Sequence, residues 1–232
     1  MLSLITGIGA RGQVGEAVGS ALAARGDVVL LAARTEQNAM DRAAEITALG
    51  HRAHGYACDL SSESQVATLA RRVRDEHGDR LDALVNLAGG FGKSGPMDAS
   101  LLAALERMLA INLTTAYLTT RAFLPMLRSA SGSIVYFASD TVLEGSGTKG
   151  ISGYVASKAA VVALMRSVAD EERQTGVRAN ALAPGSIRTA ANVAAMGQDV
   201  RYIERAQVAS AVAFLCSPGA QAITGQTIRL RA

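Results

Sequence analysis

A tyrosine and a lysine stand four positions apart in the small, apolar stretch SGYVASKAA of residues 152–160. In a helix, residues i and i+4 lie one above the other on the same face, so Tyr154 and Lys158 can act on the same small volume. A free phenol has a pKa of about 10, and a neighbouring ammonium can lower that pKa by ~1–3 units. The pair therefore predicts acid–base chemistry in which Lys158 helps Tyr154 to exchange a proton near neutral pH. The alternative is an ordinary core tyrosine followed by a lysine whose stem extends to water.

Lysine is rare in the rest of the chain. Of the 23 basic residues only three are lysines, namely Lys93, Lys149 and Lys158. A chain that fills nearly every cationic position with arginine has therefore placed one of its few lysines beside Tyr154, which favours the functional interpretation.

A glycine-rich segment, TGIGARGQVGEAV, follows the first apolar run of the chain. Glycines at a strand-to-helix turn allow close approach of the backbone, and the N-terminus of the helix offers free N–H groups to a diphosphate. The segment thus predicts a dinucleotide-binding turn built around Gly7, Gly9, Gly12 and Gly15.

The end of the second apolar run bears on the ribose of that nucleotide. An acid there would bind the 2′-hydroxyl, but the run ends LAARTE, with no acid before Arg34, and Arg11 lies in the glycine-rich segment itself. Planar guanidinium groups suit a 2′-phosphate, so we expect NADP(H) to be favoured over NAD(H). Two solvated surface arginines are the alternative.

The order of apolar runs and longer amphipathic segments predicts the fold class. Seven short apolar runs are predicted strands, at residues 2–6, 28–33, 53–58, 82–88, 133–138, 177–182 and 226–230. Helix-length segments lie between them, near 14–25, 36–49, 63–77, 99–128, 153–174 and 204–216. Continuous rather than alternating apolar runs indicate parallel strands buried on both faces, so we predict one α/β domain over residues 1–232 with helices on both sides of a parallel sheet.

Two of the predicted helices, 99–128 and 153–174, are apolar around most of their circumference. A helix needs only one apolar stripe to pack on a sheet, so a second apolar face predicts a homo-oligomer, a dimer or tetramer, built on the helices that contain Asn112 and Tyr154. The alternative is that neighbouring helices of the same chain cover these faces.

Composition argues against several other functions. The net charge of +3 comes from basic and acidic residues scattered along the chain, without a basic run, so nucleic acid is a poor candidate partner. Cys58 and Cys216 lie far apart and give neither a disulfide framework nor metal-ligand spacing, so no metal is expected. The apolar runs are too short to span a bilayer and no secretory signal is visible, so we expect a cytoplasmic protein without a membrane partner.

Several motifs occur together in a characteristic order: TGIGARGQVG, Asp59 in ACDL, the stretch NLAG at residues 86–89, INLTT, VYFASD, YVASK and NALAPGSIRT. In this ordered set the chain resembles the short-chain dehydrogenase/reductase family, in its compact single-domain branch, over nearly its full length. The resemblance implies a three-layer, doubly wound Rossmann fold with a seven-stranded parallel sheet.

The resemblance also implies a role for each motif residue. Tyr154 would be the general acid or base, Lys158 would lower its pKa and hold the nicotinamide ribose, and Ser139 would orient the substrate oxygen. Asn112 would support a proton relay by holding a water molecule. The remaining cofactor-binding residues would be Asp59, which contacts adenine, with Leu60, then Asn86, Ala88 and Gly89 along the cofactor, and Pro184, Gly185, Ile187 and Thr189 over the nicotinamide.

The chain departs from the family pattern at four places. The spacing from Gly7 through Gly12 to Gly15 is longer than the usual TGxxxGxG, which leaves open which glycine meets the diphosphate, and Leu87 replaces the usual second asparagine. Residues 140–153 form a slightly long loop rich in Gly and Ser, which we expect to be one wall of the substrate pocket. Residues 190–204, where relatives carry a substrate lid, are few, and the C-terminus lacks the frequent Asp-Gly-Gly tail.

The leading hypothesis is an NAD(P)(H)-dependent carbonyl reductase or alcohol dehydrogenase that acts on a small ketone or secondary alcohol, a 3-oxoacyl thioester being one candidate. A non-catalytic NADP-binding regulatory or scaffolding protein of the same fold is the alternative, and cofactor binding without turnover would favour it. A sugar-nucleotide epimerase is disfavoured because little chain remains for a substrate domain after residue 190. Arg201 and Arg205 are candidates for an anionic substrate, although a solvated helix face explains them as well.

Overall fold

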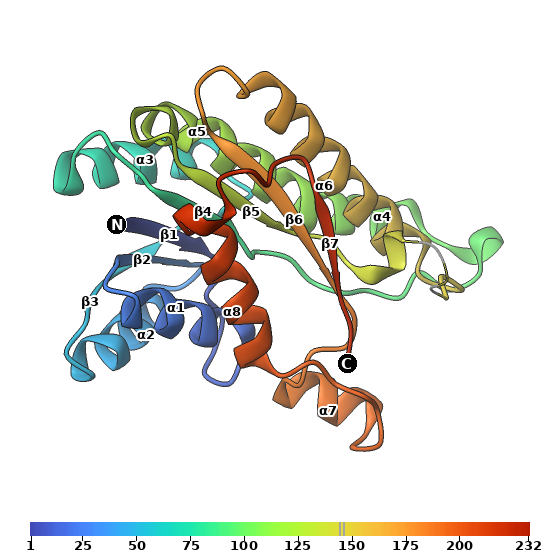
Figure 1. The fold of residues 1–232 in the computed structure, drawn as a ribbon. Helices are drawn as coiled ribbons and strands as arrows, with labels where there is room; N and C mark the ends of the chain where they lie inside the picture. The colour runs from blue at the N-terminus through green and yellow to red at the C-terminus, as the bar shows by residue number, and fades with distance from the viewer. Residues whose placement is uncertain (144, 146) are drawn as a thin grey trace.

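A single parallel sheet of seven strands organises the computed structural model, which describes residues 1–143, 145 and 147–232 (Figure 1). The strand order is β3-β2-β1-β4-β5-β6-β7. The strands are β1 (Leu2–Thr6), β2 (Val28–Ala33), β3 (Arg52–Ala57), β4 (Ala83–Asn86), β5 (Ser133–Phe137), β6 (Arg178–Pro184) and β7 (Thr227–Leu230). The predicted fold class is confirmed, and each predicted strand is present within a few residues of its expected bounds.

Helices cover both faces of the sheet in two layers (Figure 1). One face carries α3 (Glu63–His77), α5 (Thr115–Ala130) and α6 (Ser152–Glu171), and the other carries α1 (Val14–Ala24), α2 (Glu36–Ala48) and α8 (Arg205–Leu215). The short helix α4 (Leu102–Leu109) packs against α6, and α7 (Ala190–Met196) follows β6. Three 3-10 turns lie at Met97–Ala99, Asp140–Val142 and Pro218–Ala220.

The two apolar cores explain why the strand sequences are continuously apolar. Successive strand residues point to opposite faces, so Leu4 packs with the layer of α3, α5 and α6, whereas its neighbour Ile5 packs with the layer of α1, α2 and α8. The same division separates Leu30 from Leu31 in β2. A strand buried on both faces leaves no position for a solvated polar side chain.

The strand order changes direction after β3. The chain has by then added β2 and β3 on one side of β1, and it returns to place β4 on the other side of β1. In open parallel sheets, ligands bind outside the carboxyl ends of the strands at such a switch point. The fold therefore directs attention to the loops that follow β1 and β4.

The segment expected to be one helix at 99–128 is more complex. It contains α4, a π-helical turn at Ala110–Thr114 and then α5. π-Helical turns inside helices are rare and are often found at functional sites, and this one contains Asn112. Residues 190–196, for which no helix was predicted, form α7, whose N-cap Thr189 accepts a hydrogen bond from the backbone N–H of Asn192 at 3.2 Å.

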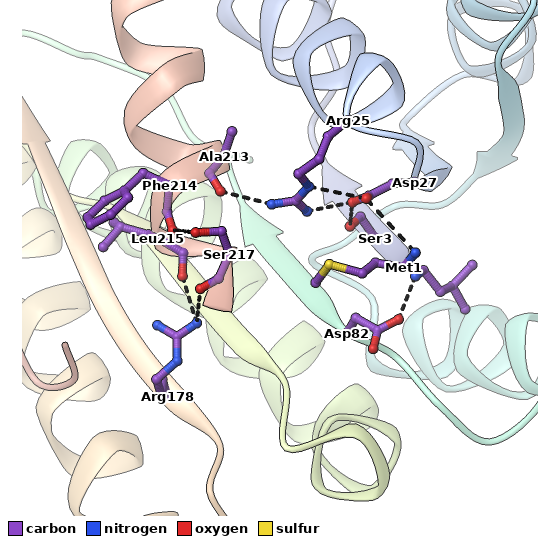
Figure 2. A network of polar contacts seen from close by, with 11 residues as sticks. Met1, Ser3, Arg25, Asp27, Asp82, Arg178, Ala213, Phe214, Leu215 and Ser217 are labelled. Carbon is purple, nitrogen blue, oxygen red and sulfur yellow. Dashed lines mark hydrogen bonds and ion pairs between the residues drawn. The ribbon is translucent and has the colours of Figure 1, made fainter. Parts of the chain in front are cut away.

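The opposite, amino-terminal edge of the sheet is closed by a polar network (Figure 2). The buried carboxylate of Asp27 accepts hydrogen bonds from Ser3 Oγ at 2.5 Å and from the guanidinium of Arg25 at 2.6 Å. Arg25 also donates to the carbonyl oxygen of Ala213, and Arg178 donates to that of Leu215, both at 2.8 Å in α8. This network fixes α8 to the ends of three strands, at the edge remote from the switch point.

Within the described residues, no helix combines the length and apolar character needed to cross a membrane. The same residues contain no cluster of three or more His, Cys, Asp or Glu side chains that could hold a metal ion.

Candidate active site

A cleft of about 380 Å³ opens at the carboxyl ends of β1, β2, β3 and β4. The structure brings seven of the predicted cofactor-binding residues into its lining: Gly7, Gly9, Arg34, Asp59, Leu60, Ala88 and Gly89. They come from four separate strand ends, so the sheet assembles the cleft at the switch point where a nucleotide is expected.

The turn after β1 needs glycine for two reasons. Gly7 and Gly9 have positive φ angles of 68° and 69°, a conformation that other residues rarely adopt. A Cβ atom on Gly7 would in addition lie 2.5 Å from the Cα atom of Ala88, so only glycine lets the ends of β1 and β4 meet. This narrow backbone floor is the cradle that a dinucleotide diphosphate requires, and the cleft thus fits an NAD(P) cofactor.

The adenosine end of the cleft carries opposed charges. Arg34 is exposed directly after β2, and Arg107 of α4 lines the same cleft. Asp59 accepts two hydrogen bonds from Ser61, from its backbone N–H at 3.0 Å and its hydroxyl at 2.6 Å, and these bonds together with Arg34 hold the pKa of Asp59 below its usual range. The carboxylate is thus fixed by its own loop, while the two guanidinium groups stay exposed.

Several predicted cofactor residues lie outside this cleft lining. Gly12 donates its backbone N–H to Glu16 at 2.7 Å, and a Cβ on Gly15 would collide with the backbone of Ile8, so Gly15 serves the packing of α1 on the turn. The Arg11 side chain is 80% exposed, 3.9 Å from Glu16. Pro184 ends β6, and the following Gly185 lies beside the carboxylate of Asp140. Ile187 pairs with Ile203 and accepts a hydrogen bond from the backbone N–H of Thr189, so these predicted residues lie outside the cleft lining.

Ser139 and Tyr154 meet beyond the carboxyl end of β5. Ser139 directly follows this strand region and is buried, and its Oγ accepts hydrogen bonds from the backbone N–H of Thr141 at 3.3 Å and from Thr141 Oγ1 at 3.0 Å. Because both accepting positions are used, the proton of Ser139 is free to point toward the phenol. A hydrogen-bonding interaction with Ser139 lowers the pKa of Tyr154, in opposition to the effect of burial.

Lys158 lies one helical turn beyond Tyr154, as the spacing predicts, and is buried. Its ammonium donates to the carbonyl oxygen of Phe137 at 2.8 Å. A Cβ built on Gly89 would lie 3.2 Å from the Lys158 Nζ, so the ammonium faces the glycine-lined floor of the cleft. Burial lowers the pKa of Lys158 to about 8.

The electrostatic prediction for Tyr154 is not met in this structure. Burial raises the pKa of the phenol above its ordinary value, and the negative charge of Asp140 adds to that rise, while the interaction with Ser139 opposes it. Lys158 is not among the groups that shift the pKa of Tyr154, and its ammonium donates to the carbonyl oxygen of Phe137 instead. Tyr154 is therefore a protonated phenol at neutral pH.

Asn112 anchors the floor of the site through three hydrogen bonds. Its Oδ1 accepts from the backbone N–H of Gly90 at 2.9 Å, and its Nδ2 donates to the Gly90 carbonyl oxygen at 3.1 Å and to Ser157 Oγ at 3.0 Å. The side chain is almost fully buried, and both of its N–H groups are used. Asn112 thus ties the loop after β4 to the helix that carries Tyr154.

Asn86, which was predicted to lie along the cofactor, does not line the cleft, and its side chain instead holds a helix against the sheet. Its amide accepts from Thr119 Oγ1 at 2.7 Å and donates to Thr120 Oγ1 at 3.1 Å, and Thr120 in turn bonds to the hydroxyl of Tyr136 at 2.8 Å. All four groups are buried between β4, β5 and α5. The network holds α5, and with it the π-helical turn, against the sheet.

Comparison with known proteins agrees with this geometry. A model of the family described as short chain dehydrogenase matches residues 3–199. The chain belongs to the short-chain dehydrogenase family. As a member it is an oxidoreductase that uses an NAD(P) cofactor and acts on small molecules.

Relatives of this short-chain dehydrogenase differ in their substrates. It is 35% identical over 229 residues to a cis-4-hydroxycyclohexanecarboxylate dehydrogenase of Sinomonas cyclohexanicum, a match that covers 94% of this chain and 90% of the relative. A hexahydroindene-carboxyl-CoA reductase of Mycobacterium tuberculosis is 34% identical over 230 residues, covering 92% and 87%. Among solved structures, a variant of actinorhodin polyketide ketoreductase with NADPH superposes with a TM-score of 0.89 at 26% identity, covering 99% of this chain and 95% of that one.

The structure also places residues in the site that the sequence reasoning missed. Arg107, Ile111 and Thr115 line the cleft from one helical face, and their four-residue spacing around Asn112 was a signal that could have identified them. Asn38, Cys58 and Ser61 also line the cleft, as does Ala33. The ring of Phe91 meets that of Tyr154 edge to face, with centroids 5.0 Å apart, and no local pattern points to it.

The loop expected to form a wall of the substrate pocket is covered only in part, because Glu144 and Ser146 lie outside the described residues. Its described beginning is the 3-10 turn at Asp140–Val142, which contains Thr141, and its end is joined to the loop after β4.

Proposed function

We propose that this short-chain dehydrogenase is an NADP(H)-dependent carbonyl reductase that interconverts a ketone and a secondary alcohol. The observation that carries the proposal is the convergence of Ser139, Tyr154 and Lys158 on one strand end, directly beside the glycine-lined cleft. The relatives whose printed names describe a dehydrogenase of a hydroxycyclohexane and a ketoreductase support this reaction class.

Each side chain has a distinct task in the proposed reaction. The bound nicotinamide supplies or accepts the hydride at the carbonyl carbon. Tyr154, which burial keeps protonated, donates its proton to the carbonyl oxygen during reduction. Ser139, oriented by Thr141, donates a hydrogen bond to the same oxygen and holds it near the phenol.

Lys158 and Asn112 support these two hydroxyls. In the proposal Lys158 holds the ribose hydroxyls from its place over Gly89, and its positive charge stabilises the phenolate that remains after proton donation. Because the Asn112 side chain is committed to Gly90 and Ser157, we assign it a positioning role in place of the expected water-holding role. It keeps the cofactor floor and the helix of Tyr154 in register.

The preference for NADP(H) rests on the charges at the end of β2. Arg34 is exposed in the cleft, and no carboxylate precedes it on the strand, while Asp59 is held by Ser61 on the next loop. A free guanidinium beside the adenosine ribose favours a 2′-phosphate.

The reaction is tested by NADPH oxidation with a panel of ketones. We expect the Tyr154→Phe variant to bind NADPH as the wild type does but to lose at least about a hundredfold in turnover, the usual contribution of a general acid. Tyr117→Phe, which removes a half-exposed tyrosine on α5, serves as the matched control and should keep full activity. Full turnover by Tyr154→Phe would show that another group supplies the proton.

We also propose that the protein forms a homo-oligomer through α4, α5 and α6. Intrachain packing of α4 on α6 covers part of the apolar surface, but Leu101 and Leu102 remain exposed at the start of α4. Sedimentation of the wild type should give a dimer or tetramer, and Leu102→Arg should shift it toward the monomer. A monomeric wild type at micromolar concentration would contradict the proposal.

A further inference from the structure

Two loops border the phenol of Tyr154, and hydrogen bonds join them to one another. The backbone N–H groups of Ser94 and Gly95 both donate to the carbonyl oxygen of Gly150, at 2.9 and 3.2 Å. The hydroxyls of Ser94 and Ser152 add a bond of 3.1 Å. The first loop continues from the Gly89–Gly90 floor and the second leads into α6, so the joined segments form one rim beside the catalytic side chains.

Each of the two joined loops carries a lysine at the junction. Lys93 immediately precedes Ser94, and Lys149 immediately precedes Gly150. Since consecutive Cα atoms are only about 3.8 Å apart, bonding of Ser94 to Gly150 also brings the two lysines near each other. Both side chains are exposed, and they are the only lysines of the chain apart from Lys158.

The charge of this lysine pair is not cancelled by an ion pair within the described part of the chain. The nearby acid on the first loop, Asp98, makes no salt bridge with either lysine, and Asp140 pairs with Arg231 at 3.6 Å. Nearly all other basic residues of the chain are arginines, and many of these have carboxylate partners. Examples are Arg128 with Glu172 and Arg188 with Glu204. Among the residues that the structure describes, the rim thus carries two exposed lysines without a carboxylate partner.

An apolar surface separates the rim from the reacting hydroxyl. Phe91, two residues before Lys93, is 59% exposed and packs its ring edge to face on Tyr154. Along this loop, the aromatic ring that contacts Tyr154 therefore comes first and the charged Lys93 follows two residues later. This sequence of surfaces suits a molecule with a carbonyl at one end, an apolar body and an anionic group at the other end.

We propose that Lys93 and Lys149 bind an anionic group of the substrate, so that the substrate class is a ketone or secondary alcohol with an apolar body and a distal acid. The proposal rests on the proposed carbonyl reductase function. The anion is either a carboxylate of the substrate itself or a phosphate of a carrier to which the substrate is bound. A compact ammonium on a flexible stem suits both, because it acts as a point charge without a fixed directional fork.

Matched pairs of substrates test the rim and distinguish the two sources of the anion. We would compare 4-oxocyclohexanecarboxylate with its methyl ester, and acetoacetyl-CoA with acetoacetyl-N-acetylcysteamine, for the wild type and for Lys93→Met/Lys149→Met. We expect the double variant to raise KM for the preferred anionic member by about threefold to tenfold, the effect of two exposed ion pairs, with less than a twofold change for the neutral partner. Added salt should raise the same KM in the wild type only.

Two controls separate this effect from a general change of charge. Arg71→Met/Arg166→Met removes two positive charges from exposed positions on α3 and α6 and should leave all four KM values unchanged. Lys93→Arg/Lys149→Arg keeps both positive charges, so it should keep most of the affinity for the anionic substrate that Lys93→Met/Lys149→Met loses. Equal KM changes for acid and ester, or a wild type that favours the neutral members, would overturn the proposal.

The rim can also be tested without turnover. In the complex of the wild type with NADP⁺, a ketone cannot be reduced, so calorimetry measures the Kd of each acid and ester directly. A loss of affinity confined to the acids in the double lysine variant supports the rim even if no ketone of the panel is reduced. Reduction of the neutral ketones without any preference for acids supports the reductase function and rejects the rim.

Discussion

The ammonium of Lys158 donates a 2.8 Å hydrogen bond to the carbonyl oxygen of Phe137, the last residue of β5. This bond holds the lysine over the end of the strand, facing Gly89, instead of directing it at the phenol one turn earlier on α6. Burial therefore shifts the two pKa values in opposite directions: it raises that of Tyr154, which stays protonated, and lowers that of Lys158, which loses its charge more easily. The lysine, not the tyrosine, is the group expected to titrate near neutral pH.

We accordingly expect kcat/KM for ketone reduction to fall as the pH rises through about 8, where Lys158 loses its charge. The raised pKa of Tyr154 keeps the phenol protonated across this range, so the tyrosine does not cause the fall. The pH dependence of kcat/KM from neutral to alkaline conditions measures this. In Lys158→Arg the residual activity should not decline near pH 8, because a guanidinium does not titrate there. The same decline in Lys158→Arg would assign it to another group.

Thr141 is expected to set the orientation of the catalytic serine. Its side chain provides one of the two hydrogen bonds that Ser139 Oγ accepts, at 3.0 Å, and so directs the serine proton toward the phenol. Thr141→Val should lower kcat by about threefold to tenfold, the rate equivalent of one hydrogen bond of about 1 kcal/mol, without changing the Kd for NADPH. Thr141→Ser keeps the hydroxyl and should restore kcat. A valine variant with unchanged kcat would show that the backbone N–H of Thr141 is sufficient.

The sheet could be predicted from sequence because two-sided burial leaves a continuous apolar run for its central strands, such as VVLLAA in β2 and SIVYF in β5. Where a strand differs from its predicted bounds, the cause is local. We expected β4 to reach residue 88, but it ends at Asn86 because the backbone N–H of Leu87 donates to the carbonyl oxygen of Val85 within the chain. Tyr154 and Lys158 were placed correctly on one face because their spacing is set by the helix itself.

Features that depend on distant segments were not predictable in the same way. The contact of Phe91 with Tyr154 joins the loop after β4 to a helix far away in sequence, and the bond of Lys158 to Phe137 depends on how α6 lies on β5. The pKa of Tyr154 was predicted in the wrong direction because sequence spacing shows a neighbouring charge but not the degree of burial. Desolvation is a property of the assembled site.

The two arginines proposed for the 2′-phosphate should differ in their effect on cofactor binding. Arg34 lines the cleft, whereas the Arg11 side chain is 80% exposed and lies beside Glu16. Arg34→Glu should therefore weaken NADPH at least about tenfold more than NADH, consistent with loss of a charge-assisted bond, and Arg11→Glu should change both affinities little. Fluorescence titration of the two cofactors measures the four constants. Equal losses for NADPH and NADH in Arg34→Glu would reject the phosphate assignment.

The amino-terminal network is expected to contribute to stability without affecting catalysis. Asp27 is only 3% exposed, and Arg25 is its main charged partner. Arg25→Met leaves this carboxylate buried without its guanidinium, which should lower the free energy of unfolding by roughly 3 kcal/mol. Denaturant unfolding measures the loss, and kcat at moderate temperature should stay unchanged because the network of Figure 2 lies at the amino-terminal ends of the strands, whereas the cleft lies at their carboxyl ends. Adding Asp27→Asn should recover part of the loss, since it removes the unpaired charge.

The junction of Gly89, Asn112 and Lys158 should tolerate no added methyl group. A Cβ on Gly89 would lie 2.5 Å from Asn112 Oδ1 and 3.2 Å from Lys158 Nζ. Gly89→Ala should therefore displace the amide from Gly90 and Ser157, lower the free energy of unfolding by about 1–3 kcal/mol and weaken NADPH binding, because the floor of the cleft moves. Gly147→Ala is the matched control, since among the described residues no heavy atom beyond its chain neighbours lies within 4 Å of the added carbon. Combining Gly89→Ala with Asn112→Ser shortens the colliding side chain, so the double variant should be less destabilised than the sum of the single variants. Strict additivity in denaturant unfolding would show that the methyl group and the amide do not collide.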